Sequence, residues 1–155
     1  MDIRTLINEN QVLLTIECET KEEAVATLAR TLEDAGKISS TENFLRDVWG
    51  RETLGDTAVG FGIAIPHARS EAVLTPAIAI GRTSGLQWNG RADSVVNLIV
   101  LLAVPARNAG SDHMTILSNV ARMLVDEQSR LALLEAETPE HVLQVIEDYQ
   151  AKKGR

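Results

Sequence analysis

The longest apolar run of the chain is VVNLIVLLAV at residues 95–104, which is interrupted by Asn97 and followed by Pro105. It has about half of the ~20 residues that a helix needs to span a bilayer. Short apolar runs that are rich in β-branched residues and bounded by turn residues are typical of strands buried on both faces. Residues 95–104 therefore predict a buried strand in a sheet that is covered on both sides.

Three further segments have strand character. Residues 77–81 (AIAIG) are short, apolar and bounded by turn residues, so they predict a second buried strand. Residues 12–16 (VLLTI) predict a short strand for the same reason. Residues 63–65 predict a strand that ends at Pro66, because proline has no N–H to donate to a neighbouring strand.

Two helices are predicted before the glycine-rich middle of the chain. Thr20 and Glu23 form a capping box, and apolar residues follow at helical spacing until Gly36 ends the pattern. Residues 42–52 carry apolar side chains on one side and predict a second helix, with Thr41 as its candidate N-cap.

The last third of the chain is predicted to be helical. Ser111 is a candidate N-cap for a helix over residues 111–125, and residues 128–135 continue as a short helix. Thr138 as N-cap and Pro139 at the first helical position begin a final helix. The whole order predicts an α/β fold of the α+β sandwich type, in which a mixed, mostly parallel β-sheet is flanked by helices on both faces.

Length and charge limit the classes of function. The 155 residues predict a single domain, residues 1–155, and the net charge of −7 disfavours nucleic acid as a partner. A single cysteine, Cys18, rules out an internal disulfide and fits a reducing compartment. The N-terminus lacks a signal pattern, so we expect a cytoplasmic protein without membrane insertion. No self-association stripe is evident, and we expect weak homo-oligomerisation or none.

Common cofactor motifs are missing from the sequence. Gly60-Phe61-Gly62 lacks the third glycine and the following helix of a dinucleotide fingerprint, and no P-loop occurs. No H-E-x-x-H motif, Cys pair or nucleophile elbow is present either. We therefore expect neither a cofactor nor a metal site, and the three histidines become the candidates for chemistry.

His67 is the first candidate. It follows the predicted strand and Pro66, whose fixed φ stiffens the backbone that leads to the ring. Arg51 upstream and Arg69 downstream could help such an imidazole to hold an anion. From the pattern alone, an ordinary surface histidine after a turn is an equally good interpretation.

His113 is the second candidate. It lies in the first turn of a predicted helix, where the helix dipole favours a neutral imidazole and free N–H groups can hold a phosphate. An exposed histidine near a cap is the alternative. We interpret His141, beside Glu140 on the last helix, as a surface residue.

A longer stretch carries a family resemblance. Residues 52–68, ETLGDTAVGFGIAIPHA, resemble the phosphorylation-site signature of the fructose/mannitol-type enzyme IIA of the bacterial phosphoenolpyruvate-dependent sugar phosphotransferase system. The signature combines an acidic residue, a spacer, an apolar–Gly pair and apolar–Ala–apolar–Pro–His–small. Residues 97–105 are similar to the central strand of that family, and residues 113–124 to the helix that follows it.

The resemblance implies roles for residues and partners. His67 would carry the phosphoryl group on Nε2, His113 would be the second histidine that faces it, and Arg51 the nearby arginine. Arg51 and His113 would then bind phosphate, with Arg69 as a weaker candidate. The donor would be the histidine-containing phosphocarrier protein, and the acceptor a IIB component of a sugar permease.

Three functions are compatible with these residues. The first is a phosphocarrier subunit, a phosphotransferase that serves sugar uptake. The second is a regulatory, nitrogen-type paralogue that controls partner proteins through the phosphorylation state of His67. The third is a binding module on the same fold in which His67 stays unmodified.

Overall fold

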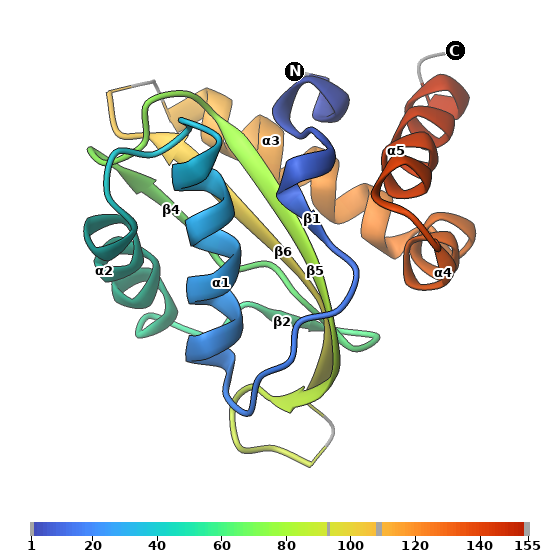
Figure 1. Cartoon of the computed structure of the whole chain (residues 1–155), viewed down its shortest axis with the longest axis horizontal. Helices are drawn as coiled ribbons and strands as arrows, with labels where there is room; N and C mark the ends of the chain where they lie inside the picture. Colours follow the sequence, from blue (N-terminus) through green and yellow to red (C-terminus); the bar gives the residue numbers. More distant parts are fainter. Residues whose placement is uncertain (1, 93, 108–109, 154–155) are drawn as a thin grey trace.

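The computed structural model describes residues 2–92, 94–107 and 110–153, and its centre is one mixed β-sheet. The strands lie in the order β1-β5-β6-β3-β2, and β4 continues the edge of β6 beyond β3 (Figure 1). β6 pairs in parallel with β3 and β4, and β1 in parallel with β5, whereas β5–β6 and β2–β3 are antiparallel. The strands are β1 (Val12–Leu13), β2 (Ala58–Gly60), β3 (Ile63–Ala64), β4 (His67–Ser70), β5 (Ala77–Gln87) and β6 (Val95–Pro105).

β6 explains why the sheet has to be covered on both faces. Leu98, Val100 and Leu102 belong to one apolar cluster, and Ile99 and Leu101 belong to the other. Successive side chains of a strand point to opposite faces, so a run that is apolar at every position needs a core on each side. The sequence prediction of a buried strand at residues 95–104 is confirmed.

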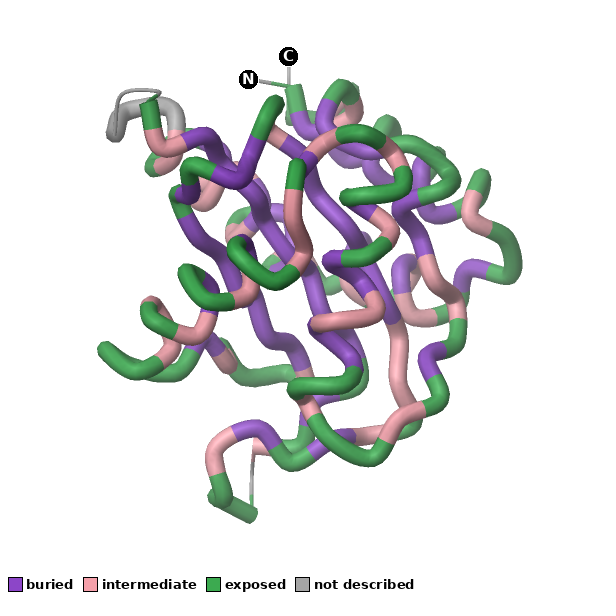
Figure 2. The backbone as a smooth tube through the Cα atoms, turned by 60° about the vertical axis from the view of Figure 1, so that its left-hand side comes forward, coloured by how far each residue is buried: buried purple, intermediate pink, exposed green. Residues whose placement is uncertain are grey.

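Helices supply the two covers. α1 (Lys21–Asp34) and α2 (Thr41–Glu52) pack on one face of the sheet, and α3 (Gly110–Val125) and α5 (Pro139–Lys153) on the other (Figure 1). α4 (Glu127–Glu135) joins α3 to α5, and the short 3₁₀ turns Ile3–Leu6 and Glu9–Gln11 pack beside α5. Figure 2 shows the resulting pattern, with buried strands inside and exposed residues on the outer turns. The predicted fold class is confirmed.

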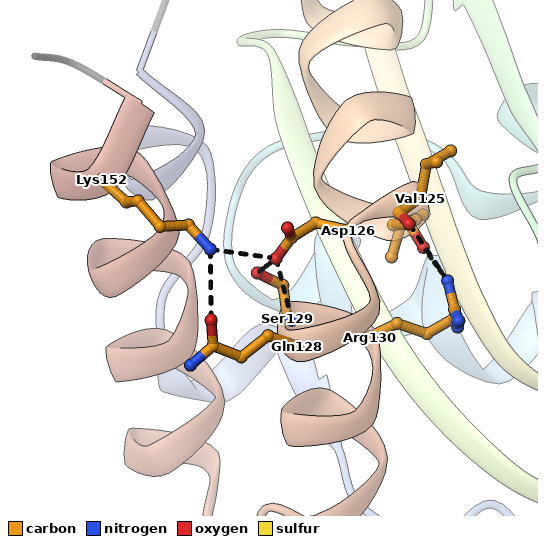
Figure 3. Close-up of polar contacts among 7 residues, drawn as sticks. Val125, Asp126, Gln128, Ser129, Arg130 and Lys152 are labelled. Carbon is orange, nitrogen blue, oxygen red and sulfur yellow. Dashed lines mark hydrogen bonds and ion pairs between the residues drawn. The ribbon is translucent and has the colours of Figure 1, made fainter.

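The junction of α3, α4 and α5 is fixed by side chains that cap helix ends (Figure 3). Asp126, the N-cap of α4, accepts hydrogen bonds from the Ser129 N–H at 3.1 Å and the Ser129 hydroxyl at 2.7 Å. Lys152 of α5 lies 3.4 Å from the same carboxylate, and Arg130 donates to the Val125 carbonyl at the end of α3. Capping satisfies backbone groups that a helix end leaves unpaired, so α3 is held at its C-terminus.

Several predicted boundaries were wrong. β1 ends at Leu13 rather than at residue 16, because the carbonyl of the next residue, Leu14, accepts a hydrogen bond from the Arg82 guanidinium instead of from the backbone of a neighbouring strand. β5 extends to Gln87, beyond the predicted end at residue 81. The prediction stopped early because the second half of the strand is polar and partly exposed and has no apolar run. Ser40 rather than Thr41 caps α2.

Two other expectations concern less regular segments. β2 was not predicted, because it lies in a stretch that the sequence presents as glycine-rich. The predicted N-cap Ser111 lies outside the described side chains. Within the described residues, no helix has the length and apolar character needed to cross a membrane.

Candidate functional site

His67 opens β4, where the chain resumes pairing with β6 after an interruption at Pro66. The Pro66 carbonyl accepts a hydrogen bond from the Leu102 N–H at 3.0 Å, and His67 lies opposite Leu102 in the parallel register. The proline lacks a donor but keeps its acceptor, so pairing continues beyond it. His67 is only 6% exposed, which corrects the expectation of a partly exposed residue beyond a strand end.

The backbone defines the tautomer of His67. The Nδ1 atom lies 2.8 Å from the carbonyl oxygen of Ile65. A carbonyl can only accept, so Nδ1 carries the proton and Nε2 keeps its lone pair. Burial lowers the pKa of His67, and the Arg51 charge adds to the lowering, whereas the Ile65 bond and Glu52 act in the opposite direction. The ring is therefore neutral near pH 7 and is nucleophilic at Nε2.

His113 lies in the first turn of α3 and faces His67. The two ring centroids are 5.3 Å apart, and the rings meet edge to face at 90°. Burial lowers the pKa of His113, and His67, Arg69 and Arg51 lower it further. The structure thus brings the two predicted histidines into direct contact although 46 positions separate them in the sequence.

The two predicted arginines approach the pair from different elements. Arg51 lies in the last turn of α2, is partly buried, and donates from Nη1 to the Gly55 carbonyl at 2.7 Å. Its positive charge lowers the pKa of both histidines. Arg69 in β4 is exposed, donates to the Ala106 carbonyl at 3.1 Å, and lowers the pKa of His113. A transferred phosphoryl group would meet this positive field beside the rings.

His141 does not belong to the site. It is exposed in the first turn of α5, and its backbone N–H donates to Thr138. Its interpretation as a surface residue is confirmed.

Exposed apolar side chains lie near both ends of α3. Met114, next to His113 in the chain, and Phe61 are each 65% exposed. Phe61 adopts φ 57°, a conformation that bulky L-residues rarely take, and the Arg130 guanidinium lies 4.1 Å from its ring centroid. That contact joins residues 69 positions apart and could not be predicted from local sequence patterns.

Glu52 was not predicted as a site residue. Its carboxylate influences the charge on His67 and binds Thr57 and Trp88. Its position as the acidic residue that opens the stretch 52–68 was the available signal. Among the described residues, no group of three or more His, Cys, Asp or Glu side chains is placed to hold a metal.

Comparison with known proteins identifies the family of the chain. A family model for the phosphoenolpyruvate-dependent sugar phosphotransferase system, EIIA 2, matches residues 5–149. A fructose-specific EIIA component from Haloferax volcanii is 36% identical over 146 residues, which are 94% of each chain. The chain belongs to this EIIA family, whose members are phosphotransferases that work through a phosphohistidine relay.

Other relatives are longer. The 2-O-alpha-mannosyl-D-glycerate-specific EIIABC component of Escherichia coli is 39% identical over 150 residues, which are 96% of this chain. The chain spans 23% of that protein and 24% of the fructose-specific EIIABC component of Bacillus subtilis. It therefore corresponds to less than a quarter of these relatives.

Solved structures share the fold. Nitrogen regulatory protein IIA-Ntr from Neisseria meningitidis superposes with a TM-score of 0.83 at 27% identity, over 93% of this chain and 98% of that one. Mannitol IIA from Escherichia coli gives a TM-score of 0.76 at 23% identity, over 90% and 98% of the two chains. The second similarity establishes the fold alone.

Proposed function

We propose that Nε2 of His67 accepts a phosphoryl group from the histidine-containing phosphocarrier protein and passes it to a IIB component of a sugar permease. The observation that carries this proposal is the 2.8 Å contact between Nδ1 and the Ile65 carbonyl. It directs the lone pair of the neutral ring to Nε2, which is what a nucleophile requires. Residues 1–155 would then act as a single EIIA domain.

The transfer needs no nucleotide or metal among its reactants. The Nε2 lone pair attacks phosphorus, a new N–P bond forms on His67, and the N–P bond of the donor phosphohistidine breaks with its electron pair left on the donor ring. The proton stays on Nδ1 throughout and keeps its hydrogen bond to the Ile65 carbonyl. In the transfer to IIB, the IIB nucleophile attacks the same phosphorus. The N–P bond on His67 breaks, and its electron pair returns to Nε2.

Positioned cations supply the catalysis in such a transfer. Charge spreads over three equatorial oxygens in the transition state. Arg51 is partly buried and its field reaches both histidines, so we assign it to those oxygens. His113 would donate a hydrogen bond to a phosphoryl oxygen from its contact position, and exposed Arg69 would add positive charge at the edge.

The surface suits transient protein partners. Met114, next to His113 in the chain, exposes apolar area beside the site, and the chain carries a net charge of −7, which suits a basic partner face. The solved complex of Escherichia coli mannitol IIA with phosphorylated IIB has the same fold in its IIA part, with a TM-score of 0.77. It supports IIB as the acceptor. With Cys18 as its single cysteine, the protein fits a reducing compartment, and we place the relay in the cytoplasm.

A regulatory role is the second candidate, and one observation favours it. The similarity to the Neisseria nitrogen regulatory protein is 27% in sequence over nearly the whole of both chains. In that role the phosphorylation state of His67 would control binding to another protein. The two functions differ in whether the phosphoryl group moves on to a IIB component and then to sugar.

The test starts with phosphoenolpyruvate, the general phosphotransferase-system enzyme and its phosphocarrier, followed by intact-mass measurement. Wild type should gain one acid-labile phosphoryl group, and His67→Ala should gain none. His141→Ala, a histidine outside the site, is the matched control and should behave like wild type. Label that remains on the His67→Ala variant would refute the assignment. Loss of the label on adding IIB components would support transport, and its retention would support regulation.

A further inference from the structure

We infer that Glu52 is a positioning residue for His67, acting through Thr57 and Ile65. The inference rests on the proposed role of His67, and it deepens that role by naming what holds the ring. Glu52 is the last residue of α2, next to Arg51, and does not touch the imidazole in any hydrogen bond that the structure shows. It acts through a chain of contacts that crosses the loop 53–57.

The carboxylate of Glu52 is fully engaged by donors. One oxygen accepts from the hydroxyl of Thr57, and the other accepts from the Thr57 N–H at 3.3 Å and from Nε1 of Trp88 at 3.4 Å. Thr57 is 6% exposed and Trp88 is 1% exposed. Buried donors that lose their acceptor cost about 1–3 kcal/mol each, so this carboxylate holds the loop against α2 and the β5–β6 connection.

The chain continues from Thr57 to the reactive ring. The Thr57 carbonyl accepts from the Ile65 N–H at 3.0 Å, and the Ile65 carbonyl accepts from Nδ1 of His67 at 2.8 Å. Both backbone polar groups of Ile65, its N–H and its carbonyl, are therefore hydrogen-bonded. Moving Thr57 would move the carbonyl that selects the tautomer of His67, and with it the direction of the Nε2 lone pair.

The same loop also gives Arg51 its partner. Arg51 donates to the Gly55 carbonyl at 2.7 Å, within the segment that Glu52 and Thr57 close. Glu52 thus fixes both the nucleophile and the arginine that we assign to the phosphoryl oxygens. Positioning of this kind is worth much in phosphoryl transfer, because the reaction depends on alignment more than on covalent chemistry.

The charge of Glu52 has a separate effect from its geometry. Among the described residues, the charged groups that shift the pKa values of the His67–His113 pair are Arg51, Glu52 and Arg69, and Glu52 is the acid in that set. It raises the pKa of His67, in opposition to burial and Arg51. A neutral side chain at this position should therefore lower the pKa of His67 further, even where the loop keeps its shape.

Two substitutions separate geometry from charge. In Glu52→Gln, the amide oxygen can accept from the Thr57 and Trp88 N–H groups while the amide NH₂ donates to the Thr57 hydroxyl, so the loop can stay closed without the charge. In Glu52→Ala, both the charge and the acceptors are lost. Glu42→Gln at the exposed start of α2 is the matched control.

The experiment measures the His67 ring by ¹⁵N NMR and phosphoryl uptake in parallel. We expect Glu52→Gln to keep the Nδ1–H tautomer with a lower pKa of His67. Glu52→Ala should mix the tautomers and slow uptake by about 10–100-fold, as loss of a supporting partner does elsewhere. Glu42→Gln should match wild type in every readout.

The outcomes separate this inference from the proposed function. If both Glu52 variants keep the wild-type tautomer, pKa and uptake rate, Glu52 has no positioning role. If wild type itself takes up no phosphoryl group, the proposed function fails, whereas the tautomer and pKa readouts still decide the role of Glu52. Should Glu52→Ala fail to fold, Thr57→Val, which removes the hydroxyl alone, gives the second test: unchanged tautomer populations and an unchanged uptake rate in that variant would overturn the inference.

Discussion

The imidazole of His113 meets the imidazole of His67 edge to face, with ring centroids 5.3 Å apart. His67 comes from the first residue of a central-sheet strand, and His113 from the first turn of the helix that follows β6. The charge of a protonated His67 is among the causes that lower the pKa of His113. The contact places a second nitrogen-bearing ring beside the ring that we propose to carry the phosphoryl group.

His113→Ala should leave phosphoryl uptake possible and slow its onward transfer. His67 keeps its tautomer through the Ile65 carbonyl, so the nucleophile survives the substitution. Loss of one positioned donor costs on the order of 10²–10³ in rate. Rapid-quench measurement of uptake and of transfer to a IIB component checks this. Wild-type rates in both steps would mean that His113 has no part in the reaction.

Arg51→Gln and Arg69→Gln should have different electrostatic signatures. Arg51 lowers the pKa of both histidines, so its neutralisation should raise both pKa values. Arg69 is a cause of the lowered pKa of His113 alone, so its loss should raise the pKa of that ring and leave His67 nearly unchanged. NMR titration of the two rings gives the answer directly. An equal shift of His67 in both variants would contradict the arrangement of the two charges.

Stability should fall as the solution becomes acidic. Both site histidines have folded-state pKa values below their ordinary 6.5. Below pH 6.5 the two histidines bind protons in the unfolded chain but stay neutral in the folded protein. The free energy of unfolding therefore decreases with falling pH until the folded-state pKa values are reached. Above pH 6.5 the two histidines are neutral in both the folded and the unfolded state, so they no longer make the free energy of unfolding depend on pH.

Urea unfolding between pH 5 and pH 8 tests that sign. The wild-type free energy of unfolding should be flat near pH 7–8 and decline below pH 6.5. His67→Gln removes one of the two buried titrating rings, so its decline should be shallower than that of wild type. A steeper decline in the variant, or a wild-type protein that gains stability toward pH 5, would contradict the lowered pKa values.

Local patterns predicted most of the fold. The helix over residues 21–34 and the strand at residues 95–104 each follow from periodicity, capping and apolar content within a short window. The interpretation of Pro66 was incomplete, because its missing N–H suggested the end of pairing. Its carbonyl still accepts from Leu102, and the chain pairs again at His67.

The two histidines of the candidate site were predictable from the sequence, but the residues that hold them in place were not. The family resemblance indicated His67 and His113, whereas their contact depends on β6 bringing distant segments together. The Glu52 carboxylate accepts from the Trp88 indole, which lies 36 positions away in the sequence, so this interaction could not be predicted from a local pattern. Long-range partners of this kind leave no periodic trace in one sequence.

Phe61→Gly should separate partner docking from stability. Phe61 stands at φ 57°, which costs a bulky residue about 1–2 kcal/mol that glycine does not incur. The substitution also removes the Arg130 contact at 4.1 Å, worth about 0.5–1 kcal/mol at an exposed site. The two effects oppose each other, so the free energy of unfolding should change by less than about 1.5 kcal/mol.

Docking should respond differently, because Phe61 is 65% exposed and offers apolar area to a partner. An aromatic anchor typically contributes more than about 1 kcal/mol to an interface, so the second-order rate of phosphoryl uptake should fall about tenfold or more. Leu74→Ala, which removes another exposed apolar side chain on the turn after β4, is the control and should keep the wild-type rate. Equal rates for the Phe61→Gly and Leu74→Ala variants would show that Phe61 takes no part in docking, since the partner would then dock without it.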